Sequence, residues 1–333
     1  MTIVNTRPTC FYHPIKVLFL DDNRAFLDVL DFEFSDKFNM LTFTNPDITM
    51  QNIDFHYKKS YSIEPLMNDV NEDFSINRII NFDACHPINL IYDKARFDNI
   101  AGIVIDYEMP EINGIEFCQK IKQKKIFKIM LTAEADKDTA ISAFNQGLID
   151  RFLLKTSNEL YDEINLAVQD LTHNHFKELS FNSYCNSVYS LFENRLYQQL
   201  FAKVASQAQA VEYYQVDNSG SILFLDKEAN PTWLVVKSQQ EILEQNELLQ
   251  GYDLPEQLRF SLAQKEKILF LLTENDYKKS IYQWVDHFFD SEKLDENYYY
   301  SIIQDKLFDS IDWSKVTSYS AYQAEENSRI IHS

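Results

Sequence analysis

Four short apolar segments of the chain each end in a side chain suited to phosphoryl chemistry. The segments and their polar ends are 17–20 with Asp21 and Asp22, 103–105 with Asp106, 129–131 with Thr132, and 152–154 with Lys155. Because the carboxyl ends of parallel strands meet at one crevice, where α/β proteins bind ligands, we expect these side chains to lie together. An aspartate in such a crevice can attack a phosphoryl group and form an acyl phosphate.

The residues that follow Asp106 strengthen this interpretation. The aspartate is followed by Met109-Pro110 and by the turn Asn113-Gly114. The order of acid pair, aspartate, hydroxyl and lysine resembles that in the receiver domain of bacterial two-component response regulators. The resemblance covers residues 16–171 apart from an inserted segment. It implies an α/β fold with a flavodoxin-like, doubly wound parallel sheet.

The resemblance also implies the roles of the site residues. Asp106 would accept the phosphoryl group, and Mg²⁺, a hard cation that prefers oxygen ligands, would neutralise the charge. Asp22 and Asp106 would supply carboxylates to this ion and Glu108 its backbone carbonyl. Asp21 would act partly through water. Lys155 would pair with the phosphoryl oxygens as a point charge.

Two further residues would report that the phosphoryl group is bound. The hydroxyl of Thr132 would be drawn onto a phosphoryl oxygen. That movement would let the ring of Phe152, three residues before Lys155, turn inward. Taken singly, such residues are ordinary, because an acid pair often caps a helix and a lysine after a strand is usually solvated. Only their joint arrangement indicates a receiver.

The chain departs from the family pattern in two places. Thr156 follows Lys155 where receivers usually have a proline after a cis bond. A cis bond without proline costs roughly 3–4 kcal/mol, so we expect a trans bond and leave the reach of Lys155 open. The second departure is an insertion of about forty residues between Asp22 and Asp106, within residues 51–99. Apolar residues at helical spacing predict a folded insertion, and a lid on the receiver flank is favoured over a partner contact.

We expect four parts along the chain. They are a receiver domain at 14–172 that includes the insertion, a helical linker at 173–210, an α+β output domain at 211–316, and a loose polar tail at 317–333. Within the linker, residues 186–208 predict a helix with a broad apolar face that includes Val188, Phe192, Leu196, Leu200 and Val204. That face could pack on the output domain or pair with another protomer, but it lacks the heptads of a coiled coil.

The output domain is expected to open with an antiparallel meander of three strands at 211–216, 221–225 and 232–237. Helices are predicted at 241–249 and 255–264, with a fourth strand at 268–272. Apolar stripes at helical spacing follow, and these are expected to be core. Their members are Tyr277, Ile281, Trp284 and Phe288, then Tyr300, Ile303, Leu307 and Ile311.

The charge of the output domain argues against nucleic acid as a partner. Residues 211–333 contain 22 acidic and 11 basic side chains, a balance of −11, whereas duplex DNA is gripped by cationic side chains. Direct DNA binding is therefore possible in principle but not supported. The chain has only 5 glycines, which excludes a glycine-rich phosphate loop. No catalytic motif is visible in the output domain. Self-catalysed phosphotransfer to the receiver is therefore the only enzymatic activity that we expect at most.

Composition indicates a cytoplasmic protein. No apolar run of 18 residues predicts a membrane span, and residues 1–9 lack the apolar core of a signal peptide. The 4 cysteines are scattered, which fits a reducing compartment better than a disulfide framework or a zinc site.

These observations predict a response regulator that accepts a phosphoryl group on Asp106 from a sensor histidine kinase or phosphotransfer protein. Phosphorylation would change dimerisation or partner binding of the output domain. The alternatives are a DNA-binding transcription factor with a non-standard output domain and a nucleotide-binding output. The segments around Gly220 and Trp233 show a looser resemblance to response regulators with an inserted receiver and a small mixed α+β output. By general resemblance, the response regulator of the Legionella quorum-sensing system is a candidate close relative, which implies a role in quorum sensing.

Overall fold

A computed structural model describes residues 8–59, 87–133, 136–180, 186–273, 276, 278–309 and 311–331. Within these ranges the chain forms two compact units. Residues 13–59 and 94–179 make the first unit, and residues 8–12, 87–93 and 180–331 belong to the second. Among the helices described, none is long and apolar enough to cross a membrane.

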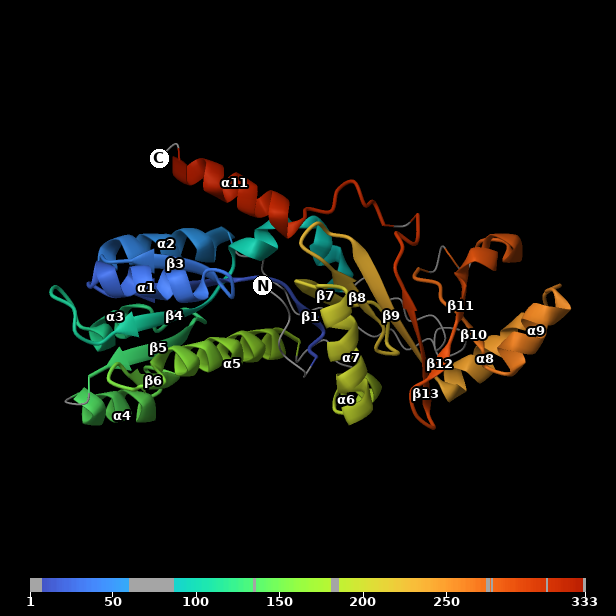
Figure 1. The fold of residues 1–333 in the computed structure, drawn as a ribbon, viewed down its shortest axis with the longest axis horizontal. Helices are drawn as coiled ribbons and strands as arrows, with labels where there is room; N and C mark the ends of the chain where they lie inside the picture. Colours follow the sequence, from blue (N-terminus) through green and yellow to red (C-terminus); the bar gives the residue numbers. More distant parts are fainter. Residues whose placement is uncertain are drawn as a thin grey trace. The chain divides into compact units, whose positions relative to one another are not determined.

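A five-stranded parallel sheet forms the centre of the first unit (Figure 1). Its strands, in spatial order, are β3 (Asn39–Phe43), β2 (Lys16–Leu20), β4 (Ile100–Asp106), β5 (Phe127–Thr132) and β6 (Arg151–Leu154). Counted along the unit, this is the order second, first, third, fourth, fifth, which is that of a flavodoxin-like doubly wound sheet. The predicted fold class is confirmed.

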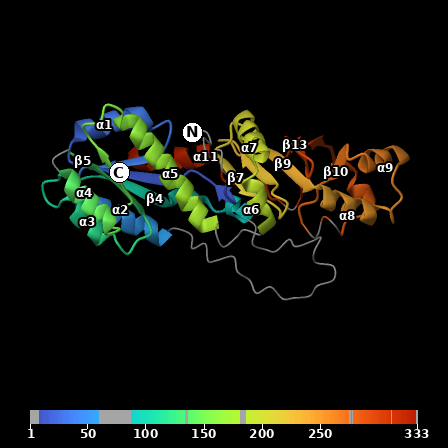
Figure 2. The same ribbon diagram turned by 90° about the horizontal axis from the view of Figure 1, so that it is seen from below.

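Helices cover both faces of this sheet (Figure 2). They are α1 (Arg24–Phe34), α2 (Pro46–Lys59), α3 (Gly114–Lys120), α4 (Lys137–Asn145) and α5 (Leu160–Ser180). One buried cluster joins α2, α3 and α4 to the strands through residues such as Ile53, Phe117 and Ala143. The helices α1 and α5 meet through the rings of Phe34 and Tyr161. Because both faces are covered, the central strands are continuous apolar runs.

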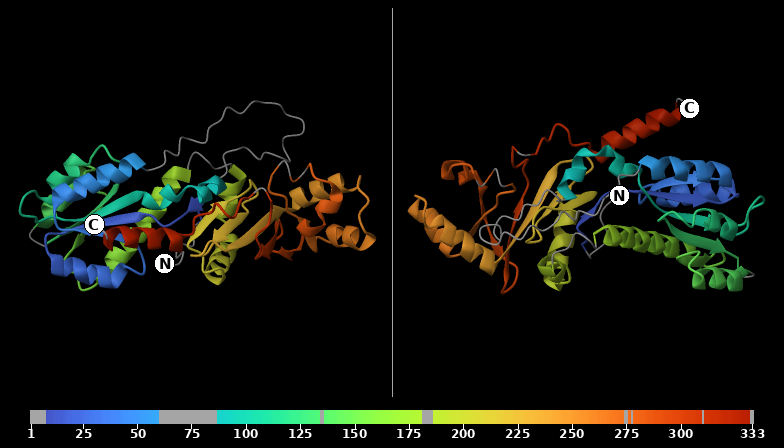
Figure 3. Two further views of the ribbon diagram at one scale, coloured as in Figure 1. Left: turned by 90° about the horizontal axis from the view of Figure 1, so that it is seen from above. Right: turned by 180° about the vertical axis from the view of Figure 1, so that it is seen from behind.

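The second unit is built on a six-stranded antiparallel sheet (Figure 3). Its strands, in spatial order, are β1 (Phe11–Tyr12), β7 (Glu212–Gln215), β8 (Ile222–Leu225), β9 (Pro231–Ser238), β13 (Tyr298–Ile303) and β12 (Glu292–Lys293). The strands β7, β8 and β9 form the predicted meander. The edge strand β1 was not predicted, because two residues carry no periodicity and their partners lie far along the chain, with Phe11 pairing with Tyr214 and Tyr12 with Tyr213.

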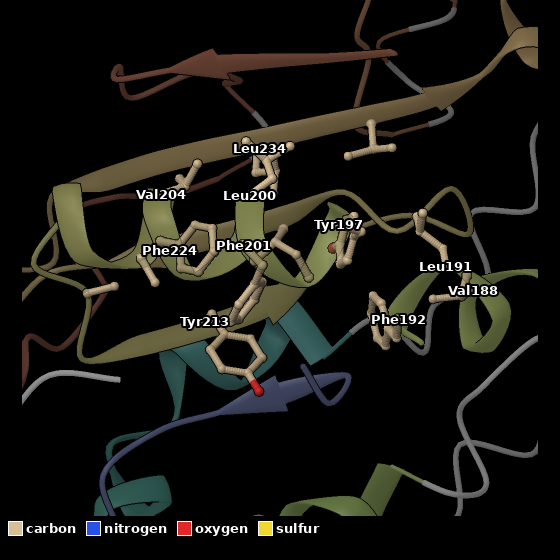
Figure 4. Packing of buried hydrophobic residues seen from close by; sticks show 14 residues of the cluster. Val188, Leu191, Phe192, Tyr197, Leu200, Phe201, Val204, Tyr213, Phe224 and Leu234 are labelled. Carbon is tan, nitrogen blue, oxygen red and sulfur yellow. The ribbon is translucent and has the colours of Figure 1, made fainter. Parts of the chain in front are cut away.

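The predicted helical linker is wrong, because its residues belong to the two units themselves. Residues 173–180 are the last turns of α5. The next helices are α6 (Asn186–Phe192) and α7 (Arg195–Gln207), which begins at the capping residue Asn194. The apolar face of α7 packs on the antiparallel sheet, where the ring of Phe201 lies 4.9 Å from Tyr213 and 5.0 Å from Phe224 (Figure 4).

This packing decides between the two uses expected for the apolar face. Phe192 and Leu200 are 3% and 7% exposed, and they form one core cluster with the sheet. Leu196, at 46%, is exposed. The face therefore serves the interior of the second unit, and a dimer built on it loses its physical basis.

The rest of the output region differs in part from the expected stripes. The helices α8 (Gln239–Leu249) and α9 (Glu256–Ala263) are confirmed. The strand β10 (Lys267–Leu269) pairs with β11 (Phe288–Asp290) in a separate two-stranded sheet. No described residue of either stripe is α-helical. In the first, Ile281 begins the 3₁₀ turn η4 (Ile281–Gln283), Trp284 lies between η4 and the 3₁₀ turn η5 (Val285–His287), and Phe288 begins β11. In the second, Tyr300 and Ile303 lie in β13, where a run of tyrosines favours a strand.

The expectation of a loose tail is also wrong. Residues from Tyr319 to Ile331 form the helix α11. Tyr319 and Tyr322, which are 2% and 5% exposed, stack on each other and anchor its first turn. Polarity misled the prediction, because among the residues of this helix whose burial is described only Tyr319 and Tyr322 are buried.

The insertion is described at its two ends only. Its first residues complete α2, and its last residues form two 3₁₀ segments, η1 (Pro87–Tyr92) and η2 (Lys94–Asp98). The predicted helical residues at 63–80 lie outside the described ranges. The segment η1 groups with the second unit, and the Tyr92 hydroxyl accepts the backbone N–H of Asp312 at 3.0 Å. For this part of the insertion, the prediction of a lid on the receiver flank is wrong.

Candidate functional site

The parallel sheet brings the predicted site residues to one edge. Asp21 directly follows β2, Asp106 ends β4, Thr132 ends β5, and Lys155 directly follows β6. The strands are in register, because Asp106 pairs with Leu131 and Thr132 with Leu154. The four side chains therefore share the carboxyl edge of neighbouring strands, as expected for a ligand crevice.

Three carboxylates form the acidic part of the site. One oxygen atom each from Asp21, Asp22 and Asp106 lies within 4.8 Å of the others. Asp21 and Asp106 are buried, at 2% and 5% exposure, and Asp22 is exposed. Two buried carboxylates this close repel each other unless a cation lies near.

Lys155 supplies such a cation. Its Nζ lies 2.7 Å from Asp21 Oδ2 and 2.8 Å from Asp106 Oδ2. Its backbone N–H donates to the carbonyl oxygen of Thr132 at 2.9 Å, which fixes the start of its side chain. The described residues contain no cis peptide bond, so the trans bond expected before Thr156 is present and Lys155 still reaches both carboxylates.

The charges in the crevice alter the ionisation of both partners. Burial raises the pKa of Asp106, and the hydrogen bond and charge of Lys155 only partly oppose that rise. Burial by itself would lower the pKa of Lys155, but its contacts with Asp106 and Asp21 outweigh burial and raise it. Lys155 is therefore firmly protonated, whereas the carboxylate of Asp106 is less stable than an exposed one.

The loop between β4 and α3 holds the backbone of Asp106 in place. The N–H of Tyr107 donates to the carbonyl of Leu131, and the N–H of Gly114 donates to the carbonyl of Tyr107, both at 2.9 Å. A Cβ on Gly114 would lie 2.4 Å from the backbone oxygen of Asp106. Only glycine leaves room for this close approach. The turn signal Asn113-Gly114 in the sequence does not reveal this steric requirement. Asn113 then caps α3 through a capping box with Glu116.

The remaining predicted residues lie around this core. The Glu108 side chain is exposed, and its backbone N–H donates to the Asp106 carboxylate. Thr132 is fully buried, and its hydroxyl donates to the carbonyl of Ala133 at 3.2 Å. Phe152 is half-buried and packs against the cluster beneath α3 and α4.

The acid pair also has the structural role that its sequence alone would suggest. Asp21 Oδ1 accepts the backbone N–H of Asn23 at 2.9 Å, and the Asn23 side chain caps α1 by accepting the N–H of Phe26 at 3.2 Å. The ring of Phe26 then lies beside the ammonium of Lys155, 5.1 Å from Nζ to the ring centroid. Sequence reasoning missed Phe26, and its position one turn after the acid pair was the available signal.

Comparison with known protein families gives a match to part of the chain. The family model described as the response regulator receiver domain matches residues 65–165. That range contains Asp106, Thr132 and Lys155 but begins after the acid pair, which the insertion separates from the rest. No curated protein matched the chain.

Two solved structures illustrate the similarity. The Legionella pneumophila response regulator LqsR is 26% identical, with 96% of each chain covered and a TM-score of 0.75. A response regulator receiver domain protein from Clostridium thermocellum is 18% identical, with 48% of this chain and 95% of that chain covered and a TM-score of 0.33. The first likeness therefore spans both units and the second spans about half of the chain.

Proposed function

This chain is a two-component response regulator with a receiver domain, and from that premise we propose that Asp106 is the residue that accepts the phosphoryl group. The observation that carries the proposal is the bridge made by Lys155, whose Nζ lies within 2.8 Å of both Asp106 and Asp21. A receiver implies a histidine kinase or phosphotransfer protein as the donor. The bridge places a positive charge where the charge of a transferred phosphoryl group would develop.

The nucleophile and the charged partner of the transfer both come from the crevice. A carboxylate oxygen of Asp106 attacks phosphorus, the bond from phosphorus to the donor breaks, and an acyl phosphate remains on Asp106. The donor keeps the bonding electrons and takes a proton from solvent or a neighbouring acid. Lys155 follows the new negative charge, and Thr132 donates its hydroxyl to a phosphoryl oxygen in place of the Ala133 carbonyl. Phe152 moves inward into space behind Thr132.

The acidic cluster fits a hard divalent cation. Three carboxylates face one ammonium, so Lys155 leaves an excess of negative charge among oxygen ligands, which is the donor set that Mg²⁺ prefers. Asp22, Asp106 and the carbonyl of Glu108 would hold the ion, with Asp21 acting partly through water. Bound Mg²⁺ would neutralise charge on the phosphoryl oxygens.

Replacing Asp22 with asparagine is expected to weaken Mg²⁺ binding by about tenfold, since affinity for such ions follows the charge count of the ligands. Calorimetric titration with Mg²⁺ would measure the change. Asp28→Asn is a matched control, because Asp28 lies on α1 in an exposed pair with Arg24. Equal affinities for the wild type and Asp22→Asn would remove Asp22 from the ligand set.

Chemical mapping tests the proposed acceptor directly. The protein is incubated with Mg²⁺ and a small phosphodonor and then reduced with borohydride, which converts an aspartyl phosphate into homoserine. Mass spectrometry should place homoserine at position 106, and the label before reduction should be stable in acid and lost in alkali. Homoserine at position 21 or 22, or no label, would contradict the proposal.

We also propose that phosphorylation changes self-association through the surface of α4, β6 and α5. Ile141 and Phe144 on α4 are 37% and 48% exposed, and Leu166 on α5 is 58% exposed. A two-fold dimer would cover these side chains, and it is the commonest oligomer. The acidic output domain is then a protein-interaction module in this proposal, and a cytoplasmic location and a quorum-sensing role remain predictions.

A further inference from the structure

The ring of Phe26 lies beside the ammonium group of Lys155. Lys155 is 28% exposed, although two carboxylates hold its ammonium group. Phe26 belongs to the first turn of α1, and its ring centroid lies 5.1 Å from Lys155 Nζ. A cation within about 6 Å of an aromatic face is attracted by the ring quadrupole.

The backbone holds this ring through the acid pair itself. Asp21 Oδ1 accepts the N–H of Asn23, and Asn23 accepts the N–H of Phe26 through both its side chain and its backbone carbonyl. The second oxygen of Asp21 accepts from Lys155. These contacts form a closed ring of four residues, which are Asp21, Asn23, Phe26 and Lys155. Within it, Asp21 both binds the lysine and positions the aromatic ring beside it.

Lys155 has to move when the crevice changes charge. Before transfer its partners are carboxylate oxygens, and afterwards the nearest negative charge is on phosphoryl oxygens farther from the Asp106 backbone. Hydrogen bonds to carboxylates are directional and must be exchanged during this movement. The attraction between the ammonium group and the ring face changes little when the ammonium moves parallel to the ring. This attraction can therefore persist while the oxygen partners of Lys155 are exchanged.

We propose that Phe26 is a positioning residue for phosphoryl transfer, which keeps the Lys155 ammonium in the crevice while its oxygen partners change. This inference rests on the proposed function of Asp106. It assigns no chemistry to the ring, because Phe26 acts through Lys155 alone. Its loss should slow transfer without removing the acceptor.

The test compares rates of labelling with a small phosphodonor, so that docking of a kinase plays no part. Phe26→Leu keeps an apolar side chain without a ring and should slow labelling by about two- to fivefold, the equivalent of roughly 0.5–1 kcal/mol. Phe26→Trp, with the stronger ring face, should label at least as fast as wild type. Phe32→Leu is the matched control, because Phe32 lies on the same helix at 85% exposure, and its rate should equal that of wild type.

Fluorinated phenylalanines at position 26 separate electrostatics from packing. Each added fluorine weakens the negative face of the ring with little change in shape, so the rate should fall stepwise with the number of fluorines. The pKa of the Lys155 ammonium, followed by nitrogen NMR, should fall in parallel. Unchanged rates across this series would overturn the inference, because packing alone would then explain Phe26.

A double-variant cycle isolates the route through the lysine. In a Lys155→Ala background, Phe26→Leu should have no further effect on the labelling rate. A further loss there would show that Phe26 acts through another group and would overturn the proposal. The proposed function and the positioning role fail in different ways. Absence of label in the wild type would reject Asp106 as the acceptor. Equal labelling rates of wild type and Phe26→Leu would reject only the positioning role of Phe26.

Discussion

Replacing Asp106 with asparagine is expected to abolish phosphorylation and to raise the free energy of unfolding at neutral pH. The amide oxygen is a poor nucleophile, so no acyl phosphate can form at this position. The fold should gain stability because Asp106 lies 5% exposed beside Asp21. Burial and the neighbouring carboxylate disfavour its charged form more than Lys155 favours it.

The pKa of Asp106 gives the sign of the pH effect. Burial raises this pKa in the folded protein, with Lys155 opposing the rise and Asp21 adding to it. The folded state therefore binds a proton more readily than the unfolded state, and the destabilising charge is relieved as pH falls through the raised pKa. The advantage of Asp106→Asn over wild type should accordingly shrink in acid, and the wild-type labelling rate should fall over the same range.

Thermal or urea unfolding and phosphodonor labelling, done on the same samples, measure both effects. Asp138→Asn, an exposed aspartate on α4, should match wild type in label and stability. Light scattering on these samples also tests the dimer, since phosphodonor should raise the apparent mass of wild type but not of Asp106→Asn. A variant that loses both label and stability would show that Asp106 supports the fold and would leave its role as acceptor without evidence.

The second large effect is expected in the other unit, where Lys237→Met should destabilise the protein by roughly 3 kcal/mol. Lys237 Nζ lies 3.0 Å from Asp217 Oδ2, and both residues are buried, at 8% and 6% exposure. Removing the lysine leaves a buried carboxylate without its opposite charge. The cost lies at the low end for broken buried pairs because Ser219 and Ser221 still donate to Asp217.

The pH dependence distinguishes this pair from simple packing. Burial alone would raise the pKa of Asp217, but the charge of Lys237 and the hydrogen bonds from Ser221 hold it below its usual value. The contribution of the pair is therefore present above the unfolded pKa, near 4, and is lost as pH falls through the lower folded value. Without the lysine the pKa of Asp217 should rise, so the gap between variant and wild type should narrow in acid.

A matched control is available in the separate two-stranded sheet of the same unit. Lys267 pairs with Asp290, but these side chains are 32% and 91% exposed, and Lys267→Met should change stability by about 1 kcal/mol or less. Urea unfolding of both variants provides the comparison. Equal losses of unfolding free energy in the two variants would mean that burial adds nothing to the contribution of the Lys237–Asp217 pair.

The candidate site was predictable because its residues lie where strands end. The sequence places Asp106, Thr132 and Lys155 directly after apolar runs, and a parallel sheet necessarily brings such ends together. The approach of Phe26 and Gly114 was not predictable in this way. Phe26 reaches Lys155 from the first turn of α1, and Gly114 reaches the backbone oxygen of Asp106 within one tight loop. Such close approaches depend on the three-dimensional path of the backbone, which residue spacing along the chain does not give.

Errors outside the site have a common physical origin. The strand β1, the helix α7 and the segment η1 take their places through partners far along the chain, with Phe11 pairing with Tyr214 as one example. Local periodicity identified α7 as a helix but not the sheet that covers it. In the same way, Tyr300 and Ile303 fit a helical stripe, and pairing with β9 makes them part of a strand.

The path of the chain between the two units has a consequence for engineering. Described segments pass from one unit to the other at Tyr12–His13, Asp93–Lys94 and Leu179–Ser180. A cut after Leu179 would therefore remove β1 from the antiparallel sheet and η1 from its own unit, leaving a ragged edge beside β7. The receiver therefore cannot be separated by a single cut and transferred as a cassette, in the way that tandem modules allow.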